Sequence, residues 1–441
     1  MKAGKEERHL LKNIGTNGLG LFVTIFNQLL LLPIYLHFWS TEMYGDWIAL
    51  SAISVFFASS DLGFTTVFTN DFVVNHTRKL YEKCRQILTN NYCFLLLVFI
   101  PLTILLIGFL WCTDLVSLLG LHSLDNTSAR WVLLILVIHV FLTMAGKVPN
   151  AVYRASHQAH KAFLIDNLVW LSESVIIALA LFARLSPLLV AIGMTLPRFF
   201  ILFFKLYDTN RLFPYTFAWK DFSMGEVKKA VSPSVSMASF PFSNTVIMQG
   251  LSLVVNKYFG ASELVLFNTT RTLANMIKFG SSIVTTSFYP EYSLAYGNKN
   301  TAGIKKLNRY CSLAAIVISL AAAVVLLPFG KYIYEIWTGG KVVFSGTLML
   351  AFLFVVMVDN YWNALMAPLV STNKHHNLGF VSLGLAVLVV LLAVAIALNN
   401  TPLFVIVLIQ LILHIPMLVM AFRSKNRFVR QLEMDSRNTK D

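Results

Sequence analysis

One long apolar stretch of the sequence carries a regular series of polar side chains. Within residues 263–290 these side chains recur at helical spacing, and two of them are basic: Asn268, Arg271, Asn275, Lys278 and Ser282. Steps of three or four residues place them on one face of a helix. No acidic residue separates Asn268 from Glu291. Two cations on a face without an acid indicate a site for an anionic ligand, held by charge-assisted hydrogen bonds.

Other apolar stretches contain further candidate binding residues. Asn17 and Asn27 share one face of the stretch 13–37, and Lys147 lies within the stretch 131–153. Lys147 is a weaker candidate for the same cationic surface. A charged side chain at the centre of a bilayer costs about 2.5–3.5 kcal/mol on insertion scales. Such side chains are therefore expected to face protein or a water-filled cavity.

Two acidic residues in apolar stretches allow two interpretations. Asp61 and Asp359 are either counter-ions of the basic side chains or carboxylates that bind a coupling H⁺ or Na⁺. Asp166, Glu173 and Arg198 leave a similar choice between a functional site and ion pairs that join helices. No other cofactor or metal site is expected, because the four cysteines show no metal-ligand or disulfide spacing.

The elements that must position these residues are membrane helices. The chain has 441 residues, 57% hydrophobic and 13% charged, with a mean hydropathy of +0.69. Soluble domains carry roughly 25% charged residues, which excludes that class. Because a membrane helix needs about 20 apolar residues, we expect an all-α integral membrane protein with twelve spans: 13–37, 44–74, 88–111, 131–153, 162–183, 187–206, 231–256, 263–290, 311–329, 343–370, 378–398 and 402–422.

The positive charge of the chain follows this topology. The 35 Lys and Arg residues exceed the 21 Asp and Glu residues, which gives a net charge of +14. Of the basic residues, 26 fall in segments expected on one side of the membrane and 4 in segments on the other. The positive-inside rule then places both termini in the cytoplasm. The first apolar stretch is expected to be retained rather than cleaved. The charge indicates topology, and nucleic acid is not an expected partner.

The two halves of the chain resemble each other at an offset of 221 residues. Residues 38–43 (FWSTEM) then align with 259–264 (FGASEL), and the basic segment 78–85 aligns with 299–306. Six spans in each half give parallel repeats, which place a substrate site between the halves. The expected parts are two six-helix bundles with a cytoplasmic linker between them and a basic cytoplasmic tail: 1–206, 231–423, 207–230 and 424–441.

Residues 40–64 (STEMYGDWIALSAISVFFASSDLGF) carry a resemblance to a known family. The segment resembles the second helix of bacterial polysaccharide, or O-antigen, flippases, and the matching residues are Glu42, Tyr44, Gly45, Trp47, Asp61, Leu62 and Gly63. These flippases belong to the multidrug/oligosaccharidyl-lipid/polysaccharide (MOP) exporter superfamily. The resemblance implies a V-shaped pair of six-helix bundles around a central cavity, with the first, second, seventh and eighth helices lining it.

The resemblance also implies a function for the polar stripe. The family moves undecaprenyl-pyrophosphate-linked oligosaccharides across the bacterial inner membrane, and it does so without being an enzyme. In this chain Arg271 and Lys278 would engage the pyrophosphate, and amides would meet sugar hydroxyls: Asn17, Asn27, Asn268 and Asn275. Membrane lipids and, from the same pathway, a polysaccharide polymerase and glycosyltransferases are the expected partners.

Three alternatives remain open at this point. A drug or cation antiporter of the same superfamily would favour an acidic, aromatic cavity, whereas the stripe is cationic. A lipid II-type flippase is a second alternative, although twelve spans fit that class less well than fourteen would. A membrane polymerase or ligase needs a catalytic outer loop, and the longest expected one, at 112–129, contains no Lys or Arg before Arg130.

Overall fold

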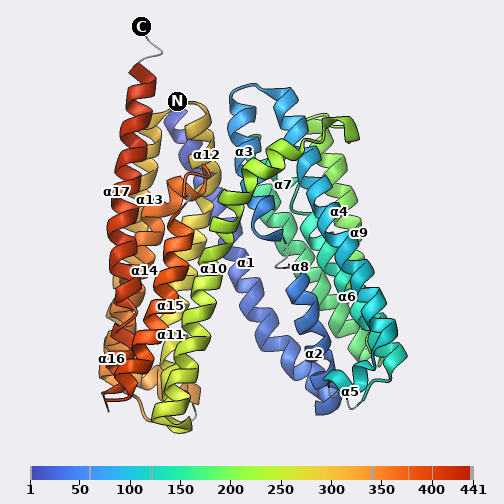
Figure 1. The fold of residues 1–441 in the computed structure, drawn as a ribbon, viewed down its shortest axis with the longest axis vertical. Coiled ribbons are helices and arrows are strands. Elements are labelled where there is room, and N and C mark those ends of the chain that lie inside the picture. Colours follow the sequence, from blue (N-terminus) through green and yellow to red (C-terminus); the bar gives the residue numbers. More distant parts are fainter. Residues whose placement is uncertain are drawn as a thin grey trace. The chain divides into compact units, whose positions relative to one another are not determined.

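The computed structural model describes residues 2–58, 61–119, 121, 123–338, 342–375, 377–399 and 401–437, and this part of the chain is helical almost throughout (Figure 1). Nine of its helices are both long and apolar enough to cross a membrane. These helices confirm the expected all-α membrane fold. The chain divides into two compact units, residues Met1–Val231 and Ser232–Asp441.

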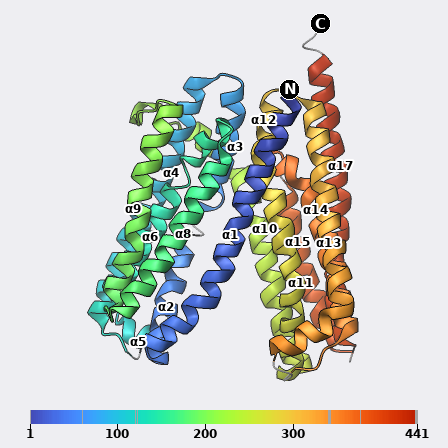
Figure 2. The same cartoon turned by 180° about the vertical axis from the view of Figure 1, so that it is seen from behind.

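Unit 1 is organised around α8, which packs against α1 on one side and α9 on the other (Figure 2). The Asn167 side chain of α8 donates a hydrogen bond of 2.6 Å to the backbone oxygen of Thr16 in α1. That contact requires a glycine opposite it, because a Cβ on Gly20 would lie 2.5 Å from the Asn167 amide oxygen. The helices of unit 1 are α1 (Lys2–Phe38), α2 (Thr41–Ala58), α3 (Phe64–Thr77), α4 (Tyr81–Cys112), α5 (Leu115–Leu119), α6 (Asn126–Ala145), α7 (Asn150–Ala155), α8 (Ala159–Phe182) and α9 (Pro187–Leu212).

Unit 2 is organised around α14, the most buried of its long helices. This helix packs against α11, α13 and α17. The helices of unit 2 are α10 (Met224–Phe259), which begins in the last residues of unit 1, α11 (Ala261–Ser287), α12 (Tyr289–Gly297), α13 (Thr301–Thr338), α14 (Gly346–Val370), α15 (Leu378–Ala397), α16 (Leu403–Leu408) and α17 (Leu411–Arg437). A short 3₁₀ helix, Trp219–Asp221, precedes α10.

The second expected span, 44–74, is not one helix. It is divided into α2 and α3, and the residues before α3 include Leu62 at φ 46° and Gly63 at φ 80°, both left-handed. The Asp61 carboxylate accepts hydrogen bonds from the Thr65 amide at 3.0 Å and from the Thr65 hydroxyl at 2.8 Å. Asp61 therefore closes the first turn of α3, where backbone N–H groups lack helical acceptors.

The expected linker and the expected tail both contain helical residues. Of the linker 207–230, residues up to Leu212 continue α9, and those from Met224 begin α10. Of the tail 424–441, residues up to Arg437 extend α17.

The start of α6 is fixed by an acidic cap. Asp125 accepts hydrogen bonds from the backbone amides of Thr127 at 3.1 Å and Ser128 at 3.3 Å. Hydrogen bonds lower the pKa of the exposed Asp125 carboxyl group. Those from the side chain and backbone of Ser128 have the largest effect, and the one from the Thr127 backbone has a smaller effect. The ionised form of Asp125 is thus part of the loop structure.

Candidate functional site

The polar stripe of α11 lies along a polar face of α10. The α10 residues are Asn244, Met248 and Ser252, which recur every four residues and so share one side of that helix. Each contacts the stripe: Asn244 binds Lys278, the Met248 backbone binds Arg271, and Ser252 binds both Arg271 and Asn268. The two helices therefore form one ladder of polar contacts within unit 2.

Arg271 is held in that ladder by neutral acceptors only. Its guanidinium donates to the Met248 backbone oxygen at 2.8 Å, to the Ser252 hydroxyl at 3.1 Å and to the Asn268 amide oxygen at 2.7 Å. The Phe267 ring centre lies 5.2 Å from the guanidinium carbon. Among the residues that the structure describes, no carboxylate pairs with Arg271. The result is a half-buried cation without a carboxylate partner among the described residues of unit 2.

Lys278 has a different environment, because a carboxylate binds it. Its ammonium group lies 2.6 Å from the Asp359 carboxylate of α14 and donates to the Asn244 amide oxygen at 3.1 Å. The Asp359 side chain is 4% exposed and that of Lys278 is 35% exposed. The structure therefore pairs a residue predicted to bind an anion with a carboxylate predicted to be either a counter-ion of the basic side chains or the site of a coupling ion.

Asp359 is enclosed by a second layer of polar groups. The Asn363 amide donates to its carboxylate at 2.8 Å, and Nδ1 of His414 in α17 lies 3.5 Å away. The indole N–H of Trp362 donates to the same His414 nitrogen at 3.1 Å. That contact makes Nδ1 an acceptor, so Asp359 depends on Lys278 and Asn363 for its short hydrogen bonds. A coupling ion at Asp359 would have to replace or weaken the Lys278 contact.

The remaining predicted residues are distributed over both units. Asn275 is half-buried on α11, with its amide 3.8 Å from the Met248 sulfur. Asn17 is half-buried on α1 of unit 1, and the side chain of Asn27 lies outside the described residues. Lys147 is exposed in the turn between α6 and α7 and interacts electrostatically with Asp61. Among the described residues, the largest group of predicted residues within one unit is that of unit 2: Asn268, Arg271, Asn275, Lys278 and Asp359.

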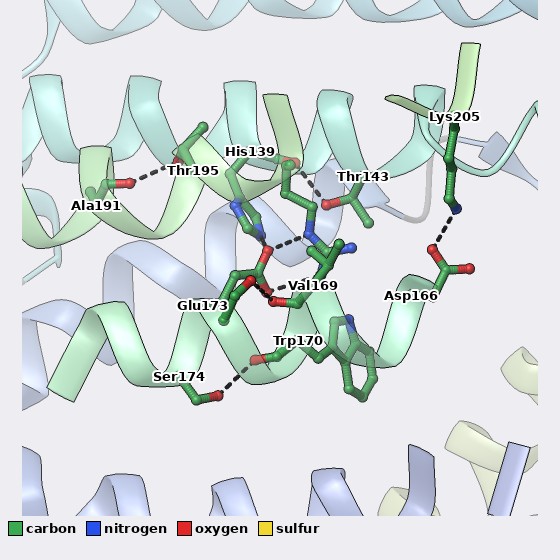
Figure 3. A network of polar contacts seen from close by, with 12 residues as sticks. His139, Thr143, Asp166, Val169, Trp170, Glu173, Ser174, Ala191, Thr195 and Lys205 are labelled. Carbon is green, nitrogen blue, oxygen red and sulfur yellow. Dashed lines mark hydrogen bonds and ion pairs between the residues drawn. The ribbon is translucent and has the colours of Figure 1, made fainter. Parts of the chain in front are cut away.

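Unit 1 contains a buried ionic network that the sequence analysis found only in part (Figure 3). Arg198 of α9 binds Glu173 of α8 through two hydrogen bonds, one of them 3.0 Å long from its terminal nitrogen, and His139 of α6 lies 3.9 Å from the same carboxylate. Such pairs join the helices that form them. The choice left open by the sequence is thereby resolved toward ion pairing for Arg198 and Glu173.

Lys205 is the part of this network that was missed. Lys205 lies near the end of the expected span 187–206, where a basic side chain can reach the cytoplasmic side, yet its side chain is only 1% exposed. Its ammonium group binds Asp166 at 2.6 Å, Asn150 at 2.9 Å and the backbone oxygen of Gly146 at 3.0 Å. The available signal was the seven-residue spacing of Arg198 and Lys205 with only apolar residues between them, since this spacing places both about two turns apart on one face of a helix.

Comparisons with known proteins identify the fold. A MATE transporter in the bent conformation superimposes with a TM-score of 0.76 at 14% identity, covering 98% of this chain and 97% of that one. An outward-facing multidrug resistance MATE family transporter of the MOP superfamily gives 0.75 at 14% identity, and a MOP superfamily transporter from Pyrococcus furiosus Vc1 (DSM3638) gives 0.73 at 13%; each match covers 97% of both chains. No protein-family model and no curated protein matches the sequence. The chain therefore has the fold of the MOP superfamily transporters.

Proposed function

We propose that this protein is a transporter that moves a polyprenyl-pyrophosphate-linked oligosaccharide across the bacterial inner membrane by alternating access, with both termini in the cytoplasm. The observation that carries the proposal is Arg271, a half-buried guanidinium whose acceptors in the described part of the chain are all neutral oxygens. Phosphate oxygens would replace those neutral acceptors with oppositely charged ones, and an arginine–phosphate pair can form two parallel hydrogen bonds. An anionic ligand is therefore favoured at this position over a neutral or cationic one.

The Lys278–Asp359 pair provides a means of coupling substrate to an ion. While Asp359 is ionised, it competes with any anionic substrate for Lys278. A proton or Na⁺ on Asp359 would weaken this competition and leave Lys278 available to the pyrophosphate. Asp61 is the weaker coupling candidate, because its carboxylate already accepts two hydrogen bonds from Thr65. The amides Asn17, Asn27, Asn268 and Asn275 would meet the sugar.

A drug or cation antiporter is the second candidate, and it is favoured by the fold match to a multidrug resistance MATE transporter. A cationic substrate needs an available carboxylate, whereas Asp359 is already bound by Lys278. Another similar structure, the MOP transporter from Pyrococcus furiosus, has a binding pocket of reverse polarity that suggests a different function for that protein. Pocket polarity is therefore the property that separates the two candidates.

The test uses the full-length protein in proteoliposomes and follows two substrates. One is a fluorescent polyprenyl-pyrophosphate oligosaccharide, whose translocation is measured by quenching from outside; the other is ethidium. The Arg271→Gln variant should translocate the lipid-linked sugar about tenfold more slowly or worse, because charged hydrogen bonds contribute roughly 1.5–3 kcal/mol each. Arg427→Gln, at an exposed arginine of unit 2, is the matched control and should behave as wild type. Full translocation by Arg271→Gln, or transport of ethidium alone, would overturn the proposal.

A further inference from the structure

Unit 2 contains a hollow of about 640 Å³ that is separate from the α10–α11 ladder. It lies between α13 and α17, with Tyr361 and Leu365 of α14 as its floor. The two helices are antiparallel there, because Lys305 near the start of α13 forms an ion pair with Glu433 near the end of α17. Both helices contribute residues at steps of three and four, so each presents one continuous face to the hollow.

The hollow changes from basic to apolar along its length. Its basic end carries Lys305 and Arg309 from α13 and Arg430 from α17, while Lys425 of α17 lies nearer the other end, with its ammonium group 4.9 Å from the centre of the Phe422 ring. Its other end is lined by apolar side chains: Leu313, Ile316 and Phe422. Exposed apolar side chains continue beyond that end on both helices, at Val317 and Leu320 of α13 and at Val419 and Ile415 of α17. Such a surface matches a ligand with an anionic head and hydrocarbon chains.

The positive charge in the hollow is largely unbalanced. Glu433 is the one acidic residue of the lining, and Lys305 pairs with it. For Arg309, Lys425 and Arg430, the described part of the chain provides no carboxylate partner. Like charges that share one hollow repel one another. An anion placed among these side chains would remove that repulsion.

Two buried polar atoms of the lining also lack partners. Neither the Asn308 amide oxygen nor the Ser312 hydroxyl oxygen has a hydrogen-bond partner among the described residues. A buried polar atom without a hydrogen-bond partner destabilises the folded protein. The Ser312 hydroxyl can donate to a phosphate oxygen, and the Asn308 oxygen can accept from a hydroxyl group of a headgroup. Both atoms lie one to two helical turns inside Lys305, at the depth where basic and apolar lining meet.

We propose that this hollow is a binding site for an anionic phospholipid of the phosphatidylglycerol class. Its phosphate would lie among Arg309, Lys425 and Arg430, its glycerol hydroxyls near Asn308, and its acyl chains along the apolar end. Basic pockets between membrane helices recognise anionic headgroups by the same chemistry. The site depends on neither the transported substrate nor its translocation.

The experiment measures lipid retention by the intact protein. Full-length protein is purified in a mild detergent, incubated with dioleoylphosphatidylglycerol or dioleoylphosphatidylcholine, and analysed by native mass spectrometry. The hollow variant is Arg309→Gln/Lys425→Gln/Arg430→Gln. The matched control is Lys306→Gln/Arg423→Gln/Arg427→Gln, which removes as many charges from exposed positions of the same two helices outside the lining.

Wild type and control should retain phosphatidylglycerol, while the hollow variant should bind it at least about tenfold more weakly, since each basic contact contributes roughly 1 kcal/mol. Phosphatidylcholine should bind weakly to all three. An equal loss in hollow and control variants would overturn the proposal, because binding would then follow net charge alone. Full displacement of the lipid by millimolar glycerol 3-phosphate would also overturn it, since the acyl chains would contribute nothing.

A second variant keeps the test valid if the triple change prevents folding. Ser312→Phe places a ring in the hollow without changing any charge. It should lower phosphatidylglycerol retention as the triple variant does, while leaving the elution profile and the unfolding temperature close to those of wild type. Undiminished retention by a folded Ser312→Phe protein would contradict binding inside the hollow.

Discussion

Removal of the Lys278 charge should destabilise unit 2 through the carboxylate left behind. Breaking a fully buried ion pair by removing one partner is unfavourable by about 3–5 kcal/mol. Here the Lys278 side chain keeps 35% exposure, and Asp359 retains its hydrogen bond from Asn363. We therefore expect Lys278→Met to lower the free energy of unfolding by about 2–3 kcal/mol. For a unit of this size the unfolding temperature should fall by about 4–12 °C.

Asp359 is more deeply buried than Lys278, so the loss of stability should depend on which of the two charges is removed. In Asp359→Asn, the remaining Lys278 ammonium can reach water, so a smaller loss of about 1–2 kcal/mol is expected. The double variant Lys278→Met/Asp359→Asn leaves no unpaired charge and should recover most of the stability. The order of unfolding temperatures should be wild type, then the double variant, then Asp359→Asn, then Lys278→Met.

The assay is thermal unfolding of purified full-length protein, followed by tryptophan fluorescence in one detergent at pH 7. Lys331→Met is the matched control, because Lys331 forms only a surface pair at 3.9 Å with Glu335, and their side chains are 71% and 48% exposed. Exposed pairs contribute about 0–1 kcal/mol. Equal shifts for Lys278→Met and Lys331→Met, or a double variant less stable than either single one, would refute the reasoning.

Three further predictions concern unit 1. Gly20→Ala should lower the unfolding temperature, because its Cβ would lie 2.5 Å from the Asn167 amide oxygen. The control is Gly18→Ala, whose Cβ would have no atom within 4 Å and which should be neutral or stabilising by about 0.5–1 kcal/mol. The same fluorescence assay compares the two variants. Lys205→Met leaves the Asp166 carboxylate without its cation, and because that carboxylate is 35% exposed and can reach water, the free energy of unfolding should fall by about 1–2 kcal/mol, measured by urea unfolding. Because hydrogen bonds lower the pKa of Asp125, its stabilising effect is complete above the ordinary carboxyl pKa of about 4 and is lost as the pH falls through the lowered value. Asp125→Asn should therefore flatten the decline of the unfolding temperature as the pH falls below about 4, and an unchanged decline would contradict this role.

The sequence predicted where the membrane helices lie, but it did not predict where a helix breaks within an apolar stretch. Apolar runs placed every long helix, because the hydropathy of a span is a sum over neighbouring residues. The break between α2 and α3 was missed, since it depends on left-handed backbone at Leu62 and Gly63 and on the cap formed by Asp61. Leucine gives no sequence signal for a positive φ angle.

The candidate site shows a similar division. The stripe from Asn268 to Ser282 could be predicted because the 3.6-residue helical period turns spacing along the chain into a shared face. Whether a cation on that stripe has a counter-ion could not be predicted. Arg271 and Lys278 look equivalent in the sequence, yet one is bound by neutral oxygens and the other by Asp359.

The sequence by itself therefore determined the membrane class, the helices and the polar face of α11, all of which follow from residues near one another in the chain. Only the tertiary structure decided which charges are paired, because α14 brings Asp359 to Lys278 and α8 brings Asp166 to Lys205. The physical reason is that an ion pair depends on distances of a few ångströms between different helices, and these distances are set by packing.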